Sequence, residues 1–206
     1  MDTLEGEDTL EGSRPEGSPV RGVSPDRGMD HDPAVELVSS ATLHRGPIFW
    51  LQREHIRLPS GLEQDLEIVR HAGAVAIAAL DAEGRMLLVR QYRHPAGTWL
   101  VEVPAGRVEP GEEELSAARR ELEEETGHRA AHWSLLRRFW PAPGFCSERM
   151  TLFLAQGLEE AGSSRLEHDP DEELELLRLT PREALERAQD AKTLVAAAEL
   201  LLAASR

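Results

Sequence analysis

One short segment, GRVEPGEEELSAARRELEEETG at residues 106–127, gathers residue types that could do chemistry on a charged substrate. In a helix, Glu121 and Glu125 are four residues apart, so their carboxylates lie on one face. Glu124 is adjacent to that face, and Arg120 lies four residues before Glu124, within ion-pairing reach. Clustered carboxylates repel each other unless a cation lies between them, and hard oxygen ligands suit Mg²⁺ or Mn²⁺. The spacing is therefore consistent with a metal site.

A helix is expected over about residues 113–126, because Ala, Leu, Glu and Arg dominate there. Pro110 and Gly111 mark a turn before the helix, and Gly127 is a natural stop. Glutamates at 112–114 suit a first helical turn, where the helix dipole favours negative charge. An apolar stripe that would pack on a sheet lies opposite the carboxylates and comprises Leu115, Ala118 and Leu122.

The same segment resembles the Nudix box, G-x5-E-x7-R-E-U-x-E-E-x-G-U, in which U is an apolar residue. Every charged or glycine position matches, and Leu122 fits the first apolar position. His128 stands where the last apolar residue is usual and is the one departure. The match disfavours the alternative of a solvated, ion-paired helix, which the helix sequence on its own leaves open. The matching residues are Gly106, Glu112, Arg120, Glu121, Glu124, Glu125 and Gly127.

The resemblance implies a set of metal ligands. Glu121 and Glu125 match the principal metal-binding carboxylates, and Glu124 matches a third. Glu112 is a further acidic contributor, and the backbone carbonyl of Ala105 corresponds to a ligand. Mg²⁺ ions held there would neutralise charge on a diphosphate and lower the pKa of an attacking water. Arg120 is expected to orient the carboxylates.

Segments beside the box resemble one subfamily, the ADP-ribose pyrophosphatases. They are LVRQYRHP from Leu88 and WLVEVPAG at 99–106, together with Pro143, which stands 16 residues after Gly127. This resemblance covers about residues 35–200 and implies a homodimer that exchanges an N-terminal sheet between subunits.

The subfamily resemblance also implies substrate contacts. Arg93 of the Q-Y-R motif, with Arg90 beside it, is expected to bind phosphate, because the planar guanidinium matches phosphate oxygens. Glu102 is a candidate acceptor for ribose or adenine hydrogen bonds. A surface arginine and a solvent-facing strand glutamate are the alternatives for Arg93 and Glu102. The base that deprotonates water is assigned to the acidic loop, at Glu172 or Glu173, with Glu148 as a rival.

Composition bounds the class of protein. The chain has 206 residues, 40% of them hydrophobic, which suits one domain with a core and additional segments. A formal net charge of −15 without a basic stretch argues against nucleic acid or an anionic membrane as partner. The single cysteine, Cys146, excludes an internal disulfide and fits a reducing compartment. No apolar window suits a membrane span, so a cytoplasmic protein is expected.

Three regions are expected along the chain. Residues 1–33 are acidic and rich in Gly and Pro, and they repeat Asp-Thr-Leu-Glu-Gly, so a disordered tail is predicted, with Met29 as an alternative start. Residues 34–70 alternate apolar and polar residues and predict a small antiparallel dimerisation sheet. Residues 71–206 form the expected catalytic domain.

The catalytic domain is expected to be an α/β (α+β) sandwich, with helices on both sides of a mixed sheet, because strands flank the box helix and a helix closes the chain. Its expected strands are residues 74–80, 85–91, 99–103, 133–140, 149–156 and 173–179. Thr180 with Pro181 opens one helix, and a last helix covers about residues 192–204. The Nudix resemblance implies the same fold.

These observations lead to one expectation about function. The chain is expected to hydrolyse the diphosphate of ADP-ribose to AMP and ribose 5-phosphate, with Mg²⁺ or Mn²⁺. The alternatives are hydrolysis of another ADP-sugar or a dinucleotide, and a Nudix-like nucleotide-binding regulatory domain without catalysis.

Overall fold

The structure is a computed structural model, and it describes residues 32–162 and 173–205. The predicted disordered tail falls almost wholly outside this range. So does Glu172, one of the two candidate bases in the acidic loop. None of the helices in the described part of the chain is long and apolar enough to cross a membrane.

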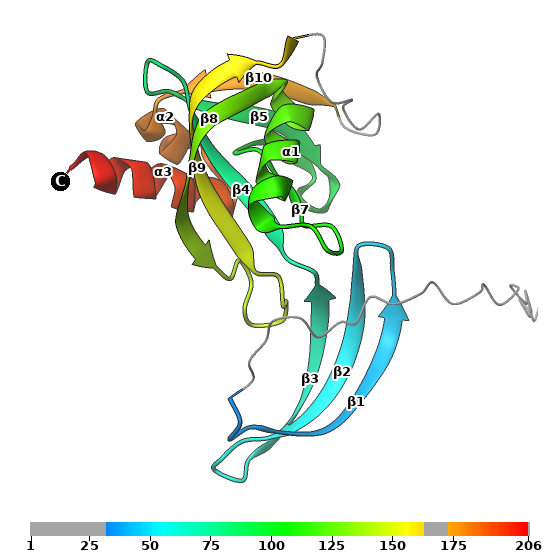
Figure 1. Cartoon of the computed structure of the whole chain (residues 1–206). Helices are drawn as coiled ribbons and strands as arrows, with labels where there is room; N and C mark the ends of the chain where they lie inside the picture. Colours follow the sequence, from blue (N-terminus) through cyan, green and yellow to red (C-terminus); the bar gives the residue numbers. More distant parts are fainter. Residues whose placement is uncertain (1–31, 163–172, 206) are drawn as a thin grey trace, which may run out of the picture.

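A three-stranded antiparallel sheet precedes the main domain, as the alternating pattern predicts (Figure 1). Its strands are β1 (Glu36–Arg45), β2 (Phe49–Arg57) and β3 (Glu63–His71). In sequence, the first strand shows alternation only over residues 35–38. In the structure it continues to Arg45, because pairing with β2 extends it through two bulges.

The main sheet has seven strands and is mixed, with β4 and β9 parallel and its other pairs antiparallel. The order is β10-β5-β4-β9-β8, while β6 pairs with β5 and β7 pairs with β4. The strands are β4 (Ala74–Leu80), β5 (Met86–Arg93), β6 (Thr98–Glu102), β7 (Ala105–Arg107), β8 (His128–Phe139), β9 (Met150–Glu160) and β10 (Leu174–Leu179). A single 3-10 turn, His94–Ala96, follows β5.

Helices cover both faces of the main sheet, which confirms the expected sandwich (Figure 1). Helix α1 (Glu114–Thr126) packs on one face, and α2 (Pro181–Arg187) and α3 (Ala191–Ala204) pack on the other. Strand β4 is buried on both sides, so its residues divide by alternation. Val75, Ile77 and Ala79 face Ala118 and Leu122 of α1, and the intervening alanines 74, 76 and 78 face α3.

The ends of the helices follow the sequence signals. Gly127 closes α1 in the left-handed conformation, with φ of 69°, and its N–H donates to the Glu123 carbonyl at 2.8 Å. Thr180 and Glu183 form a capping box at the start of α2, with Pro181 in its first turn. Gly127 thus ends α1 directly before β8, and the capping box begins α2 directly after β10.

Candidate active site

The first feature of the site is a contact that only glycine permits. Gly106 lies in β7, directly against the carboxylate of Glu121 on α1, and a Cβ at this position would overlap that carboxylate. The backbone of Gly106 does not need the left-handed conformation, since its φ is not positive. Close approach of strand and helix is therefore the physical reason for glycine at the start of the box.

Arg120 connects the carboxylates of the box. Its Nε and one terminal nitrogen bond both oxygens of Glu112 at 3.1 Å, and the other terminal nitrogen bonds Glu121 at 2.7 Å and Glu124 at 2.9 Å. It also donates to the Arg107 carbonyl at 3.0 Å. The Arg120–Glu124 pair is the four-residue pair that the spacing predicts. One guanidinium therefore orients three carboxylates that would otherwise repel each other.

These contacts shift the pKa of both partners at the centre of the cluster. The hydrogen bond from Arg120, against the opposing effect of burial, holds the pKa of Glu112 below its usual value of 4.5, and the backbone N–H of Glu109 adds to it. The same bond to Glu112 raises the pKa of Arg120 further, with smaller contributions from Glu121 and Glu124. Glu112 and Arg120 therefore both stay charged at neutral pH, and a carboxylate must be ionised to bind a metal.

The remaining predicted metal ligands lie beside this cluster. Glu125 is buried and accepts a bond of 3.3 Å from the Ala105 N–H, so the start of β7 and helix α1 meet at these two residues. Within the described chain, no three His, Cys, Asp or Glu side chains surround an ion position directly; three of these glutamates converge on Arg120 instead. The donor atoms are all oxygens, however, and they suit a hard divalent cation.

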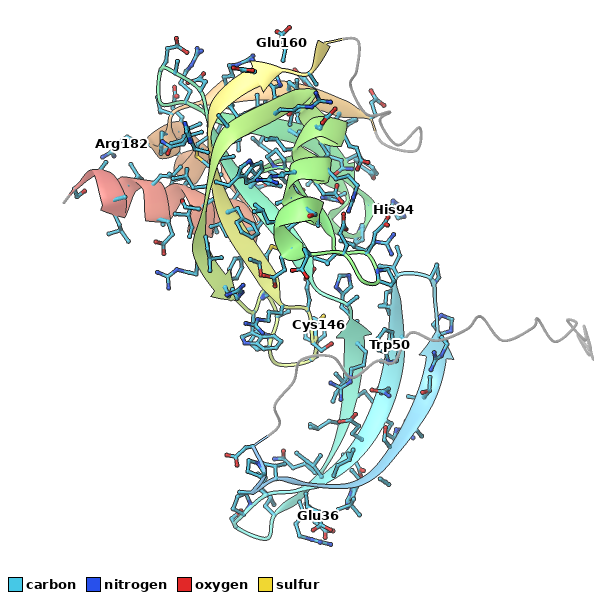
Figure 2. All side chains as sticks on the ribbon, in the orientation of Figure 1. Glu36, Trp50, His94, Cys146, Glu160 and Arg182 are labelled. Carbon is cyan, nitrogen blue, oxygen red and sulfur yellow. The ribbon has the colours of Figure 1, made fainter. Side chains whose placement is uncertain are left out.

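A cavity of about 1430 Å³ opens above the carboxylates. Segments far apart in the sequence line it: the β1–β2 turn and Trp50, the residues from β7 to α1, the start of α3, and the loop before β9. In Figure 1 the β1–β2 turn points toward the segment that precedes α1, and Figure 2 labels Trp50 at that end of the small sheet. The N-terminal sheet thus contributes directly to the wall of the site.

The loop before β9 is fixed by the small sheet. Val69 at the end of β3 donates to the Phe145 carbonyl at 2.8 Å and accepts from the Ser147 N–H at 2.9 Å, and the Ser147 hydroxyl accepts from the His71 N–H at 2.9 Å. These bonds set the position of Glu148, which lines the cavity as a candidate base.

His71 is a site residue that sequence reasoning missed. It lines the cavity, and its Nδ1 lies 3.8 Å from Glu148 and accepts the Gly73 N–H at 3.2 Å. Burial lowers the pKa of His71, and the positive charge of Arg107 lowers it further against an opposing effect of Glu148. The neutral ring therefore carries its proton on Nε2. A lone histidine at a strand end gives no motif that could have identified it.

The predicted phosphate ligand Arg93 also lines the cavity. Its guanidinium bonds Glu102 at 2.6 and 3.0 Å, and Lys192 bonds the same carboxylate at 3.0 Å. Glu102 is 2% exposed, so it lies behind these two cations. Arg90 lies elsewhere, stacked 4.6 Å over the Trp99 ring and paired with Glu175 at 3.1 Å.

Two other predicted features lie at a distance from the cavity. Glu173 is exposed just before β10 and does not line the cavity. His128, the departure from the box pattern, begins β8, where its Nδ1 lies 2.8 Å from the Thr126 carbonyl and its Nε2 lies 3.3 Å from Arg178. Nδ1 must donate to the carbonyl, and Nε2 then accepts from Arg178. A histidine is suited to this position because it bonds the end of α1 and β10 together.

With the fold and the carboxylate cluster in view, the chain belongs to the Nudix family: the model of the NUDIX domain matches residues 69–200. Proteins of this family generally use a divalent metal, and the resemblance of residues 106–127 to the Nudix box is confirmed.

Among its relatives, an ADP-ribose pyrophosphatase of Mycobacterium tuberculosis is 44% identical over 68% of this chain and 67% of that protein. An ADP-ribose pyrophosphatase of Bacillus subtilis is 38% identical over 77% of this chain and 88% of that protein. A methanol dehydrogenase activator of Bacillus methanolicus is also 38% identical, over 81% and 92%. The crystal structure of an ADP compounds hydrolase superimposes with a TM-score of 0.72 at 22% identity, covering 86% of this chain and 97% of that one, and it shows the same fold.

Proposed function

We propose that this Nudix hydrolase cleaves the diphosphate of ADP-ribose to AMP and ribose 5-phosphate, with Mg²⁺ or Mn²⁺ as its metal. The observation that carries the proposal is the contact of Gly106 with Glu121, which holds the carboxylate cluster below a cavity of about 1430 Å³. That volume exceeds the size of most small-molecule pockets and accommodates a nucleoside diphosphate sugar. The names of the relatives from M. tuberculosis and B. subtilis support ADP-ribose as the substrate.

The metal ligands in this proposal are Glu121 and Glu125, with Glu124, Glu112 and the Ala105 carbonyl as further contributors. A divalent ion bound there supplies positive charge to the diphosphate and lowers the pKa of a water. Arg120 orients Glu112, Glu121 and Glu124 through bonds of 2.7 to 3.1 Å.

Three glutamates remain candidates for the base that accepts the proton of water. Glu148 lines the cavity, held by the loop that β3 fixes. Glu172 and Glu173 of the acidic loop stay predictions, since Glu172 lies outside the described residues and Glu173 is exposed. Glutamine substitutions at the three positions separate the candidates, because only the loss of the base removes the ascending limb of the pH–rate profile.

The substrate-binding part of the proposal gives Arg93 the role of phosphate ligand. Arg93 reaches the cavity, and its fork geometry is held by Glu102. Glu102 serves Arg93 rather than the substrate directly, since its carboxylate is almost fully buried. Arg90, which stacks on Trp99, would act only by supporting β5 and β6.

We further propose that two chains form a homodimer through an exchanged N-terminal sheet. Large apolar side chains of this sheet and its turns are 42–56% exposed in the single chain: Leu37, Val38, Leu43, Ile48, Phe49 and Leu62. Such a surface suits a partner copy. Sedimentation at micromolar concentration is expected to give a dimer, and a monomer would contradict this proposal. A cytoplasmic location and the absence of nucleic-acid or membrane partners stay predictions.

A panel of nucleoside diphosphate compounds tests the proposed function. ADP-ribose, other ADP-sugars, NADH and diadenosine polyphosphates are incubated with Mg²⁺, using the wild type and Glu121→Gln. Fastest cleavage of ADP-ribose to AMP and ribose 5-phosphate is expected. Preference for another compound would reject the substrate but keep the reaction class. No turnover of any compound would reject catalysis and favour the regulatory alternative.

A further inference from the structure

The start of α3 forms a wall of the cavity that the metal cluster and Arg93 do not account for. Asp190, Ala191 and Lys192 all line the cavity. Asp190 caps α3 by accepting the Thr193 N–H with its Oδ1 at 3.1 Å. This wall lies next to β6, because the Thr193 hydroxyl accepts the Val103 N–H at 2.9 Å.

A series of ion pairs, with positive and negative side chains in alternation, crosses this wall. Arg93 bonds Glu102 at 2.6 Å, Glu102 bonds Lys192 at 3.0 Å, and Lys192 bonds Asp190 at 3.1 Å. The two middle members are largely enclosed, with side chains 3% and 13% exposed, whereas Arg93 is 39% exposed. This series of ion pairs therefore fixes the positions of its outer members, Arg93 and Asp190, relative to each other.

Asp190 has a carboxylate oxygen that accepts no hydrogen bond from the described residues. Its Oδ2 is buried and has no hydrogen-bond partner among the described residues. The indole Nε1 of Trp50 is likewise buried without a hydrogen-bond partner among the described residues. Trp50 and Asp190 line the same cavity. Buried polar atoms are nearly always hydrogen-bonded, so two such atoms on one cavity indicate groups that a ligand satisfies.

We propose that Asp190 is a specificity-determining residue whose Oδ2 accepts a hydrogen bond from a ribose hydroxyl, next to a phosphate bound by Arg93. A carboxylate oxygen has no proton to donate at neutral pH, so it selects a hydroxyl and rejects a phosphate oxygen. Lys192 and Glu102 are positioning residues that keep the acceptor and the guanidinium within one ligand's reach. This inference rests on the proposed function for its substrate class, and it identifies a hydroxyl acceptor other than Glu102.

ADP-ribose contains two riboses whose hydroxyls could donate to Asp190. Binding of the two products, each of which keeps one ribose, shows which ribose Asp190 contacts. Calorimetric titration with Mg²⁺ compares AMP with 2′-deoxy-AMP and 3′-deoxy-AMP, and ribose 5-phosphate with 2-deoxyribose 5-phosphate. The wild type is expected to bind one hydroxylated product about tenfold more tightly than its deoxy counterpart, the effect of one hydrogen bond to a charged group. The pair that shows the difference identifies which ribose Asp190 contacts.

Asp190→Ser is expected to abolish that difference, because serine still caps α3 but lacks the second oxygen. Asp190→Asn serves as a second variant that keeps the size of the side chain. Thr180→Ala is the matched control: it removes the cap of α2 outside the cavity, so it lowers the melting temperature and leaves the hydroxyl preference unchanged. The control separates loss of a helix cap from loss of a ligand contact.

The outcomes are separable from those of the proposed function. A wild type that binds neither product, that shows no hydroxyl preference, or that keeps its preference in both Asp190 variants overturns the role of Asp190. A wild type that shows the preference and loses it in the variants, yet does not hydrolyse ADP-ribose, supports the role of Asp190 and rejects the proposed substrate.

Discussion

Arginine–glutamate pairs occur in both parts of the molecule, but their surroundings differ. On the N-terminal sheet, Arg53 and Glu67 pair at 2.7 Å with side chains 57% and 56% exposed. At α1, Arg120 pairs with Glu121 at the same distance, but those side chains are 24% and 13% exposed. Water screens the first pair, so it contributes little, whereas enclosure strengthens the second. Residue type and distance are the same, and it is the enclosure beside Gly106 that makes the second pair part of a site.

The largest expected effect comes from the glycine that permits this enclosure. Gly106→Ala is expected to reduce turnover at least about 100-fold, because the added methyl displaces the Glu121 carboxylate, and misplacement by about 1 Å has that effect. Steady-state rates with Mg²⁺ check it. Gly144→Ala is the matched control, since Gly144 has open space at its Cβ position and no positive φ. Equal rates for Gly106→Ala and Gly144→Ala would show that the close contact is unimportant.

Removal of the arginine tests the comparison of the two regions directly. Arg120→Met is expected to lower the free energy of unfolding by about 2 kcal/mol, below the cost for a fully buried pair because the guanidinium is 24% exposed. Arg53→Met, the matched variant on the small sheet, is expected to leave the unfolding midpoint unchanged. Urea denaturation measures both. Similar losses in the two variants would mean that enclosure does not distinguish the regions.

A smaller effect is expected from pH at the junction of the two regions. Because the pKa of His71 is lowered in the folded protein, the unfolded chain binds its proton first as pH falls. Above the unfolded pKa of about 6.5, His71 is neutral in both states and does not lower the free energy of unfolding. As pH falls from there through the folded pKa, the unfolded chain takes up the proton first and the free energy of unfolding decreases. The melting temperature of His71→Gln is expected to fall less than that of the wild type between pH 7.5 and 5.5.

His55 on the small sheet gives the opposite sign and serves as the control for that measurement. The hydrogen bond that His55 donates to Asp65 raises the pKa of His55, so its contribution to stability is present at low pH and is lost as pH rises through the folded pKa. His55→Gln is expected to show a steeper fall toward low pH than the wild type. Parallel pH profiles for all three proteins would contradict the assigned directions.

The smallest expected effect concerns the loop that the small sheet fixes. Ser147→Ala removes the acceptor of the His71 N–H but leaves the two backbone bonds of Val69 in place. A loss of about 1 kcal/mol in unfolding free energy is expected, the usual value of one hydrogen bond, with a decrease in kcat that remains below tenfold. Ser134→Ala on the exposed edge strand β8 is the control. A decrease far above tenfold would assign the hydroxyl a direct part in the reaction.

The sequence predicted the parts of the fold and the site that depend on local spacing. The helix from about residue 113, its end at Gly127 and the pair of Arg120 with Glu124 follow from propensity, capping and four-residue periodicity. The β7 strand was not predicted, because three residues carry no alternation, and β8 begins at His128 rather than 133, since its first residues include few apolar side chains.

Residues that meet only through the tertiary fold were not predicted. Trp50, His71, Asp190 and Lys192 line one cavity from positions up to about 140 residues apart, and no local pattern relates them. The pairing of Glu102 with Lys192 could not be predicted for the same reason, because the two residues lie on segments far apart in the sequence. Local spacing predicts the carboxylate cluster around Arg120, and the packing of distant segments determines the other residues that line the cavity.

The most direct measurement compares one glutamate from each region in the same assay. ADP-ribose hydrolysis is followed with Mg²⁺ and with EDTA for the wild type, Glu121→Gln and Glu67→Gln. Activity that requires Mg²⁺, falls at least about 100-fold in Glu121→Gln and is unchanged in Glu67→Gln is the predicted result. Turnover by Glu121→Gln at the wild-type rate, or equal losses in both variants, would contradict the assignment of catalysis to the enclosed cluster.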